Sequence, residues 1–232
     1  MTLSIIPVPG IGEIQPGTDL AETILEAIHA AGLRLEDDDV VVVTHKVVSK
    51  AEGATARYAS DAEYRAIKER EAAAVIRRRG DLMIAETRQG FICANAGVDR
   101  SNVEPGLAVL HPRDPDRSAH RLRLRFERGS RKRLAVIVTD TFGRAWRRGL
   151  TDVAIGMSGM PALHDHRGAA DTWGRKLEVT EVALVDEIAA AADLVMGKAE
   201  GIPVAIVRGL SWPEGEGRAT DLVRPPGEDL FR

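Results

Sequence analysis

One carboxylate between two hydroxyls is the group in this chain best suited to holding a cation. Asp140 stands between Thr139 and Thr141, directly after the apolar, β-branched run of residues 134–138. Such a run is too short for a helix and is typical of a buried strand. Carboxylate and hydroxyl oxygens suit a hard cation such as Mg²⁺ or Mn²⁺. We therefore expect a strand that delivers Asp140 at its carboxyl end, with a plain strand and turn as the alternative.

A group of guanidinium side chains follows that carboxylate closely. Arg144, Arg147 and Arg148 all lie within eight residues of Asp140. Guanidinium groups suit phosphate or carboxylate ligands. The cluster predicts an anion site near the cation, and the alternative is a solvated basic patch on the surface.

Further phosphate-binding candidates follow a second apolar run. Residues 40–44 predict a fully buried and central strand, and His45, Lys46, Ser49 and Lys50 come directly after it. Lysine supplies a point charge and serine a hydrogen bond. This segment predicts either a phosphate site or a strand that leaves the core into a solvated, lysine-rich loop.

Two other loops could serve the same ligand. Residues 9–17 hold three glycines and two prolines, which predict a shaped loop that a ligand can approach closely, although a plain turn has the same composition. This loop matches neither the Walker A pattern nor the dinucleotide fingerprint. Asp99 offers a second carboxylate and Asn102 a neutral polar group, in a stretch that is also ordinary turn composition.

Two further candidates are weaker. His164, Asp165 and His166 resemble metal ligands by type, but adjacent residues point in different directions, so we favour a polar loop over a zinc site. The single cysteine, Cys93, has no evident base partner, and we expect it to be a small core residue.

Composition bounds the class of protein. The chain has 232 residues, 44% hydrophobic residues and a formal net charge of −3, which argue for a substantial core and against a general nucleic-acid binder. One cysteine excludes a disulfide framework and a cysteine-built zinc or iron–sulfur site, so a reducing cytoplasm is the simplest compartment. No signal peptide is recognisable, and no stretch approaches the ~18 continuous apolar residues of a membrane span.

The elements that must position these residues alternate between helices and strands. Apolar spacing, capping residues and breakers predict helices over residues 18–31, 60–79, 119–127 and 185–196, with Thr18 or Asp19 and Ser118 as caps. Strands are predicted over residues 3–8, 40–44, 81–87, 134–138, 177–184 and 203–209, and residues 91–93 begin another apolar segment. We expect one α+β unit over residues 1–212, with a subdomain in the middle and no clean linker. Residues 213–232 are expected to form a mobile tail.

Taken together, the motifs resemble the coenzyme F420:L-glutamate ligase family, also called the F420-0:gamma-glutamyl ligase family. The resemblance spans roughly residues 4–210 and is specific because several long motifs occur in the same order. They are the opening PG-IGEI-QPG loop and residues 40–53, 97–104, 111–119, 136–156 and 192–209.

The resemblance implies a fold and an activity. The fold is α+β, with mixed sheets and helices in a family-specific arrangement that is neither Rossmann nor P-loop. The activity is GTP-dependent addition of L-glutamate to the lactyl-phosphate side chain of coenzyme F420-0, then γ-linked addition to F420-1. The implied cofactors are Mg²⁺ or Mn²⁺, two ions per site, with K⁺ as a further cation. The implied assembly is a cytoplasmic, intertwined homodimer that binds neither nucleic acid nor membrane.

The resemblance also implies roles for individual residues. Asp99, Asp140 and Lys50 are the implied catalytic residues, and Asp99, Asp140 and Thr141 the implied metal ligands, with Thr141 on the second metal. The implied GTP contacts are Ile11, Gly12, Glu13, Ile14, His45, Lys50 and Asn102.

The chemistry that these residues could support is phosphoryl activation of a carboxylate. We hypothesise that the acceptor carboxylate attacks the γ-phosphate of GTP, and that the glutamate amine then displaces phosphate from the acyl phosphate. Positioning and charge neutralisation would be the protein's main tasks, with Lys46 assisting Lys50. His45, Glu13 and Glu52 are all candidates for the base, and Arg144 and Arg147 for orienting the acceptor. The alternatives are a related carboxylate–amine ligase with another acceptor, and a nucleotide-binding module without catalysis.

Overall fold

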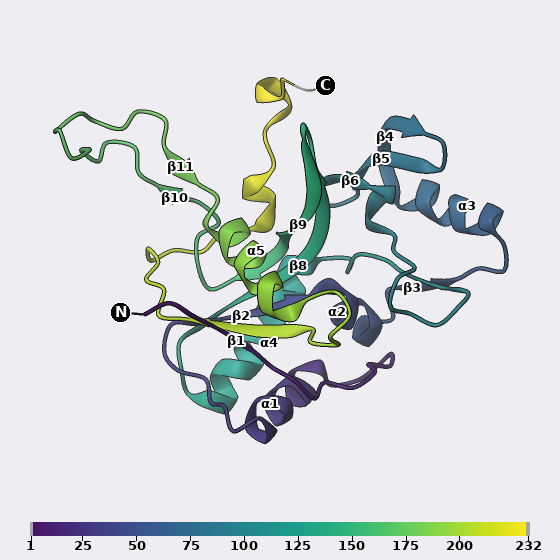
Figure 1. Ribbon diagram of the computed structural model, residues 1–232, viewed down its shortest axis with the longest axis horizontal. Helices are drawn as coiled ribbons and strands as arrows, with labels where there is room; N and C mark the ends of the chain where they lie inside the picture. The colour runs from purple at the N-terminus through teal and green to yellow at the C-terminus, as the bar shows by residue number, and fades with distance from the viewer. Residues whose placement is uncertain (1, 231–232) are drawn as a thin grey trace.

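A five-stranded mixed sheet organises the larger part of the molecule in this computed structural model, which describes residues 2–230 (Figure 1). Its strand order is β1 (Ser4–Pro7), β12 (Val204–Arg208), β2 (Asp39–Thr44), β8 (Leu134–Arg144) and β9 (Arg147–Ser158). β2 and β8 run parallel, and the other neighbours are antiparallel. The four valines of β2 are fully buried, as expected for a strand with both faces covered.

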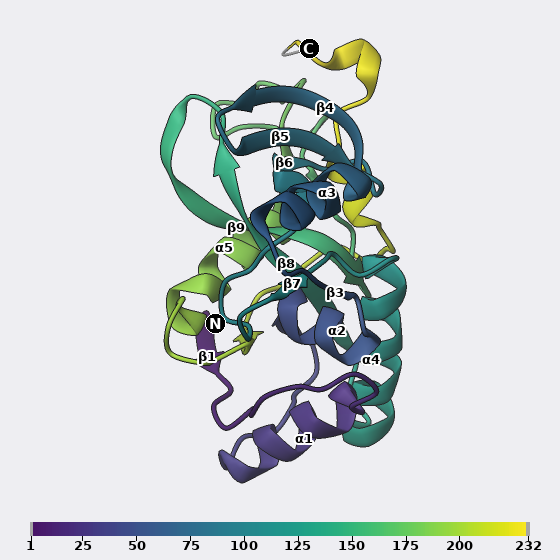
Figure 2. The ribbon, with the colours of Figure 1, turned by 90° about the vertical axis from the view of Figure 1, so that its right-hand side faces the viewer.

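Helices cover both faces of this sheet. α5 (Leu184–Met196) packs on one face, and α4 (Pro115–Ser130) packs on the other against β8 and β9 (Figures 1 and 2). α1 (Leu20–Ala30) lies against α4, and Asp19 caps it by accepting a hydrogen bond from the backbone N–H of Glu22. The predicted helices at residues 18–31 and 185–196 are therefore confirmed.

The middle of the chain forms a second lobe beside the main sheet (Figure 2). Its three-stranded sheet, β4–β5–β6, carries α3 at its side, and a small cluster around Tyr64 and Ile67 packs beneath α3. The elements of this lobe are β3 (Thr55–Arg57), α3 (Asp61–Glu71), β4 (Ala72–Arg79), β5 (Leu82–Thr87), β6 (Ile92–Ala94), the 3₁₀ turn η1 (Asn95–Gly97) and β7 (Leu107–Val109). Strands and helices of both lobes together make the expected α+β fold.

Two segments complete the described chain. A long arm that contains β10 (His164–Asp165) and β11 (Glu181–Val182) projects from the main lobe (Figure 1). The last turns are η2 (Ala219–Leu222) and η3 (Pro226–Glu228), and η2 lies against β9. Within the part of the chain that the structure describes, no helix has the length and apolar character needed to cross a membrane.

Two predicted elements were too long. The helix predicted over residues 60–79 ends at Glu71, and Ala72–Arg79 instead forms β4 by pairing with β5. Alanine and arginine favour helix locally, so this strand is set by its partner and not by its own residues. The strand predicted over residues 177–184 is reduced to the two residues of β11.

Three boundaries near the polar residues were also wrong. Residues 45–52 form a helix, α2 (His45–Glu52), where we predicted an irregular segment. β8 does not end at Asp140 but continues to Arg144, because β9 pairs with it along that whole length. α4 begins at Pro115 with Asp114 as its cap, one turn before the predicted start, because proline suits the first position of a helix.

Candidate functional site

The parallel pairing of β2 and β8 brings two of the predicted site residues together. Thr44 and Thr139 are register partners, so the residues that follow them, His45 and Asp140, lie side by side. His45 Nε2 is 3.2 Å from Asp140 Oδ1. His45 is the first residue of α2, so the same strand end also points α2 and its lysines toward the site.

A third residue, His111, completes this buried cluster. Its Nε2 lies 2.8 Å from Asp140 Oδ2, and its ring meets the His45 ring edge to face at 5.1 Å between centroids. Gly97, in the left-handed region with a φ of 71°, packs directly on the His111 ring, and a β-carbon there would collide with it. His111 comes from a Pro- and Asp-rich loop, and nothing in that loop's sequence signals its long-range contact with Asp140.

The electrostatics of this cluster favour an ionised carboxylate beside a neutral imidazole. Burial by itself would raise the pKa of Asp140, but His45 and His111 outweigh burial and hold that pKa far below its usual range. Burial lowers the pKa of His111 despite the opposing effect of Asp140. The buried Nδ1 of His111 has no hydrogen-bond partner among the described residues.

His45, His111 and Asp140 form a donor set that fits a metal ion. One potential ligand atom from each lies within 4.8 Å of the other two. His45 Nε2 is buried and makes no aligned hydrogen bond within the described chain, so it is free to coordinate. Two imidazole nitrogens and one carboxylate oxygen fit Mn²⁺ better than Mg²⁺, which prefers an all-oxygen shell.

The end of the glycine loop and Lys50 of α2 line one cavity. Ile11 and Ile14 are buried in the core and hold Gly12 and Glu13 at the surface between them. Lys50 Nζ donates to Glu13 Oε1 at 2.7 Å. The cavity has a volume of about 680 Å³, and its walls include Glu13, Ile14, Lys50 and Asn102.

The segment that holds Asp99 and Asn102 closes the far side of that cavity. Lys50 Nζ also donates to the Asn102 carbonyl oxygen at 3.3 Å. Asp99 pairs with Lys46 at 2.8 Å and accepts from the backbone and hydroxyl of Ser101. Burial would raise the pKa of Asp99, but Lys46 and Ser101 outweigh it and lower that pKa. The Asp99 carboxylate thus lies outside the His45–His111–Asp140 cluster and faces a lysine of α2.

The sequence analysis missed Lys198 as a site residue. Its Nζ donates to Thr141 Oγ1 at 2.8 Å, to Asp152 Oδ1 at 2.9 Å and to Asp193 Oδ1 at 2.6 Å. Its carbonyl oxygen accepts from Asn102 Nδ2 at 3.1 Å. Burial lowers the pKa of Lys198, but Asp193 and Asp152 outweigh burial and raise it. Lys198 therefore links Thr141 to the loop that holds Asn102. Its position after α5 did not signal this role in the sequence.

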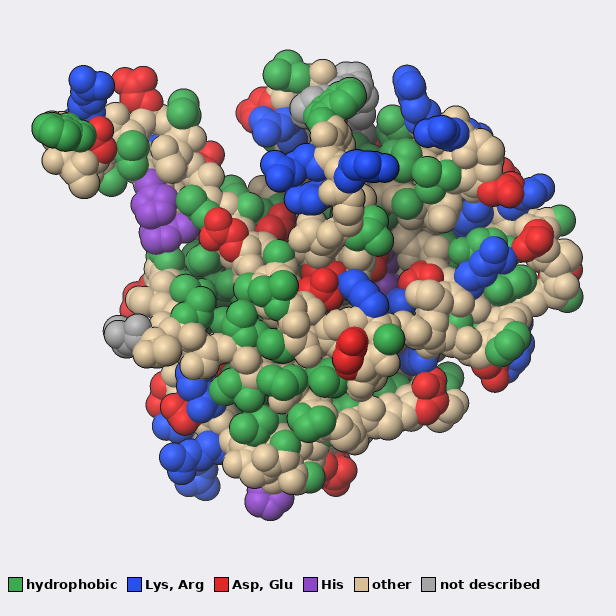
Figure 3. All heavy atoms as spheres, in the orientation of Figure 1, with side chains coloured by type: hydrophobic (Ala, Val, Ile, Leu, Met, Phe, Trp, Pro, Cys, Tyr) green, Lys and Arg blue, Asp and Glu red, His purple; other side chains and the backbone are tan. Residues whose placement is uncertain are grey.

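Charged side chains meet on one face of the molecule at this place. Figure 3 shows acidic and basic groups side by side in the middle of the view, over the region where α2 and β8 lie in Figure 1. Among the residues assigned to the site, Glu13 has an exposed carboxylate, whereas Lys50 is only 8% exposed.

Other candidates lie elsewhere. Arg144 and Arg147 face each other at the turn of the β8–β9 hairpin, about 13 Å along the strand from Asp140. Glu52 ends α2 and accepts from the Ser118 hydroxyl at 2.6 Å. The rings of His164 and His166 stack at 4.0 Å in the projecting arm.

Comparison with known proteins agrees with this set of motifs. The model of the F420-0:gamma-glutamyl ligase family matches residues 10–209. A Methanopyrus kandleri protein named coenzyme F420:L-glutamate ligase is 44% identical, across 100% of this chain and 98% of its own length. Proteins of the same name from Methanothermobacter thermautotrophicus and Archaeoglobus fulgidus are 41% and 40% identical over all of this chain, and over 100% and 97% of their own lengths.

Proposed function

The chain belongs to the F420-0:gamma-glutamyl ligase family, and from that premise we propose that it joins L-glutamate to coenzyme F420-0 at the expense of GTP. The product of one cycle would accept a second glutamate through a γ-linkage. The observation that carries the proposal is the cavity lined by Glu13, Lys50 and Asn102, in which Lys50 Nζ donates to both of the other residues.

The reaction proceeds in two displacements. An oxygen of the acceptor carboxylate attacks the γ-phosphorus of GTP, the bond to the β–γ bridging oxygen breaks, and GDP leaves. The amine of glutamate then attacks the acyl phosphate carbon, inorganic phosphate leaves and an amide bond forms. The amine must give up one proton for each bond formed, so the site needs a base and cationic groups rather than a covalent nucleophile.

The residues of the site have distinct tasks in this scheme. Lys50, now paired with Glu13, is placed to neutralise phosphate charge when a nucleotide enters the cavity. Lys198 positions Thr141 and the Asn102 loop through its three side-chain contacts and its carbonyl oxygen. Of the three candidate bases, Glu13 is the one with an exposed carboxylate in the nucleotide cavity, since His45 is 1% exposed and Glu52 faces Ser118.

A divalent cation belongs to this proposal. His45, His111 and Asp140 would hold a first ion, and Thr141 with Asp99 would contribute to a second, with K⁺ as a further cation. Bound there, such ions supply positive charge against the phosphates. The protein's own part is to keep Asp140 ionised within the fold and to hold the two imidazoles against it.

A direct assay tests the function. Purified protein is incubated with F420-0, L-glutamate, GTP and Mn²⁺, and the products are analysed by mass spectrometry. We expect a mass gain of one glutamyl unit, followed by a second, with stoichiometric release of GDP and phosphate. GTP binding without phosphate release would instead indicate a non-catalytic module, and phosphate release only with another carboxylate would indicate a different acceptor.

A further inference from the structure

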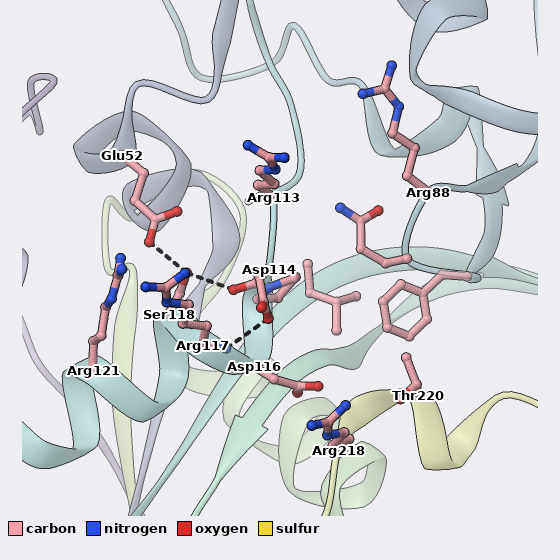
Figure 4. A pocket seen from close by; sticks show the side chains of 14 residues that line it. Glu52, Arg88, Arg113, Asp114, Asp116, Arg117, Ser118, Arg121, Arg218 and Thr220 are labelled. Carbon is pink, nitrogen blue, oxygen red and sulfur yellow. Dashed lines mark hydrogen bonds between the residues drawn. The ribbon is translucent and has the colours of Figure 1, made fainter.

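A second cavity, separate from the nucleotide cavity, is lined by five arginines. It has a volume of about 690 Å³ and lies where the 88–91 turn, the 113–114 loop, the start of α4 and the segment before η2 meet. We call it the arginine pocket, after Arg88, Arg113, Arg117, Arg121 and Arg218 (Figure 4). Three of its guanidinium groups come from residues 113–121, and the fold brings Arg88 and Arg218 to them from distant parts of the chain.

These cations lack carboxylate partners. Among the described residues, no ion pair joins any of the five guanidinium groups to an acidic side chain, whereas Arg57, Arg125 and Arg208 elsewhere are each paired. The acidic side chains of the pocket already have other partners. Asp114 caps α4, Asp116 Oδ1 accepts from two backbone N–H groups, and Glu52 accepts from a hydroxyl. Arg88 donates to the Arg70 carbonyl oxygen at 2.8 Å. The pocket therefore holds more positive than negative charge, and its guanidinium groups are not neutralised by ion pairs before an anion binds.

The arginine pocket adjoins the buried cluster around Asp140. His111 contacts Asp140, and Arg113, two residues further along the same loop, reaches the pocket. Phe91 in the pocket wall meets Phe142 at 6.5 Å between ring centroids, and Phe142 stacks on His111 at 6.3 Å. One ring thus separates the pocket wall from the residue that holds the Asp140 carboxylate.

We propose that the arginine pocket binds the phosphodiester and carboxylate groups of the acceptor's side chain and directs the reacting carboxylate toward the nucleotide. This inference rests on the proposed ligase function. A phosphodiester and the carboxylate next to it match separated guanidinium groups, because each anionic group can be contacted by a different arginine. The pocket's volume is in the range of sites for drug-sized ligands and exceeds what free glutamate requires. Arg144 and Arg147 of the hairpin do not line this pocket and face each other across a turn.

A binding titration tests the pocket without any turnover. F420-0 is titrated against protein in the presence of Mn²⁺ and a non-hydrolysable GTP analogue, without glutamate, and the deazaflavin's own fluorescence reports binding. We expect the double variant Arg113→Ala/Arg117→Ala to raise the Kd for F420-0 about tenfold or more, with a weaker salt dependence than the unchanged protein. Arg128→Ala is the matched control, because Arg128 is exposed on the same helix but does not line the pocket, and its Kd should not change.

Steady-state kinetics separate the two proposals. The double variant should show a raised KM for F420-0 with unchanged KM values for GTP and glutamate. A raised KM for glutamate alone, or equal F420-0 affinity in all three proteins, would overturn the pocket assignment and leave the ligase proposal standing. If F420-0 binding depended on the arginines but the unchanged protein formed no amide, the pocket assignment would stand and the ligase proposal would be overturned.

Discussion

Asp140 is the residue on which the proposed site depends, because it is an acidic side chain held ionised within the fold by two histidines. Replacing it by asparagine keeps the size of the side chain and removes its charge. We expect Asp140→Asn to lower kcat about 100-fold or more, since the site then lacks a fixed negative ligand for a cation. Product mass measured over time gives the rate, and circular dichroism checks the fold.

Asp81→Asn is the matched control for that substitution. Asp81 is an exposed carboxylate of the second lobe that pairs with Arg65 at 2.8 Å, and its loss should leave turnover unchanged. If Asp140→Asn retained near-normal GTP-dependent ligation, Asp140 would have no part in the reaction.

Lys50 presents a different case, because its ammonium group is nearly buried and pairs with the exposed carboxylate of Glu13. We expect Lys50→Ala to weaken GTP binding about tenfold or more, since a charge-assisted contact to phosphate is lost. Isothermal titration with GTP and Mn²⁺ measures the change. Lys132→Ala, which removes a surface lysine paired with Asp37, should bind GTP normally, and equal affinity in both variants would exclude Lys50 from the site.

The reactivity of the Cys93 thiol tests whether this side chain is buried in the native protein. Burial, with a smaller effect of Asp140, raises the pKa of the Cys93 thiol to about 12. Because a thiol reacts as its thiolate, a raised pKa leaves almost no reactive form at pH 8. We expect iodoacetamide to leave the native protein unlabelled and to label it fully in denaturant. Rapid labelling under native conditions would show that β6 opens far more readily than its buried position implies.

At the scale of elements, the sequence correctly predicted the helices and strands that are determined by their own residues. The valine run of β2 and the capped, amphipathic α1 were recognisable, because neighbouring residues in the sequence determine both the burial of the strand and the periodicity of the helix. β4 was not, because its pairing with β5 overrides the helix preference of its alanines and arginines. α2 follows β2 with no side-chain cap, and the one available signal was Gly53, whose left-handed conformation ends the helix.

The contact between β9 and the start of α4 is tight enough to measure. Gly156 of β9 faces Pro115, and a β-carbon on Gly156 would collide with the Pro115 backbone. We expect Gly156→Ala to lower the free energy of unfolding by about 1–3 kcal/mol, because the first turn of α4 must move. Urea denaturation measures the change. Gly143→Ala on the neighbouring strand is the control, since its β-carbon would meet only Leu150 at 4.0 Å, and an equal loss in both variants would refute the proposed close packing.

At the scale of the whole molecule, the site is a product of topology. Residues 45 and 140 lie far apart in the chain and meet only because β2 and β8 are parallel neighbours in register. The sequence itself offered Asp99, Lys50 and Asn102 as candidates and the resemblance to a family implied their roles, but His111 and Lys198 came only from the folded arrangement. His111 contacts Asp140, 29 positions away, and Lys198 contacts Asp152, 46 positions away, and no local pattern encodes either contact.

The second lobe presents a surface that a single chain leaves uncovered. β4 is an edge strand of eight residues, paired on one side only among the described residues, and nearly all of it is exposed. Val75, Ile76 and Leu82 on this sheet are 44%, 38% and 46% exposed. A long edge strand with exposed apolar side chains is prone to pair with another chain unless something covers it. We therefore propose that this surface joins two copies in the homodimer that the family resemblance implies.

Light scattering after size-exclusion chromatography tests that assembly. We expect the unchanged protein to have twice the mass of the 25.1 kDa chain. Ile76→Glu/Leu82→Glu should shift it to the monomer, because two charges would then have to be buried against the partner. Leu194→Glu places the same charge at an 82% exposed position of α5 and should leave the dimer intact. A monomeric unchanged protein, or a double variant that remains dimeric, would show that the β4 surface does not join two copies.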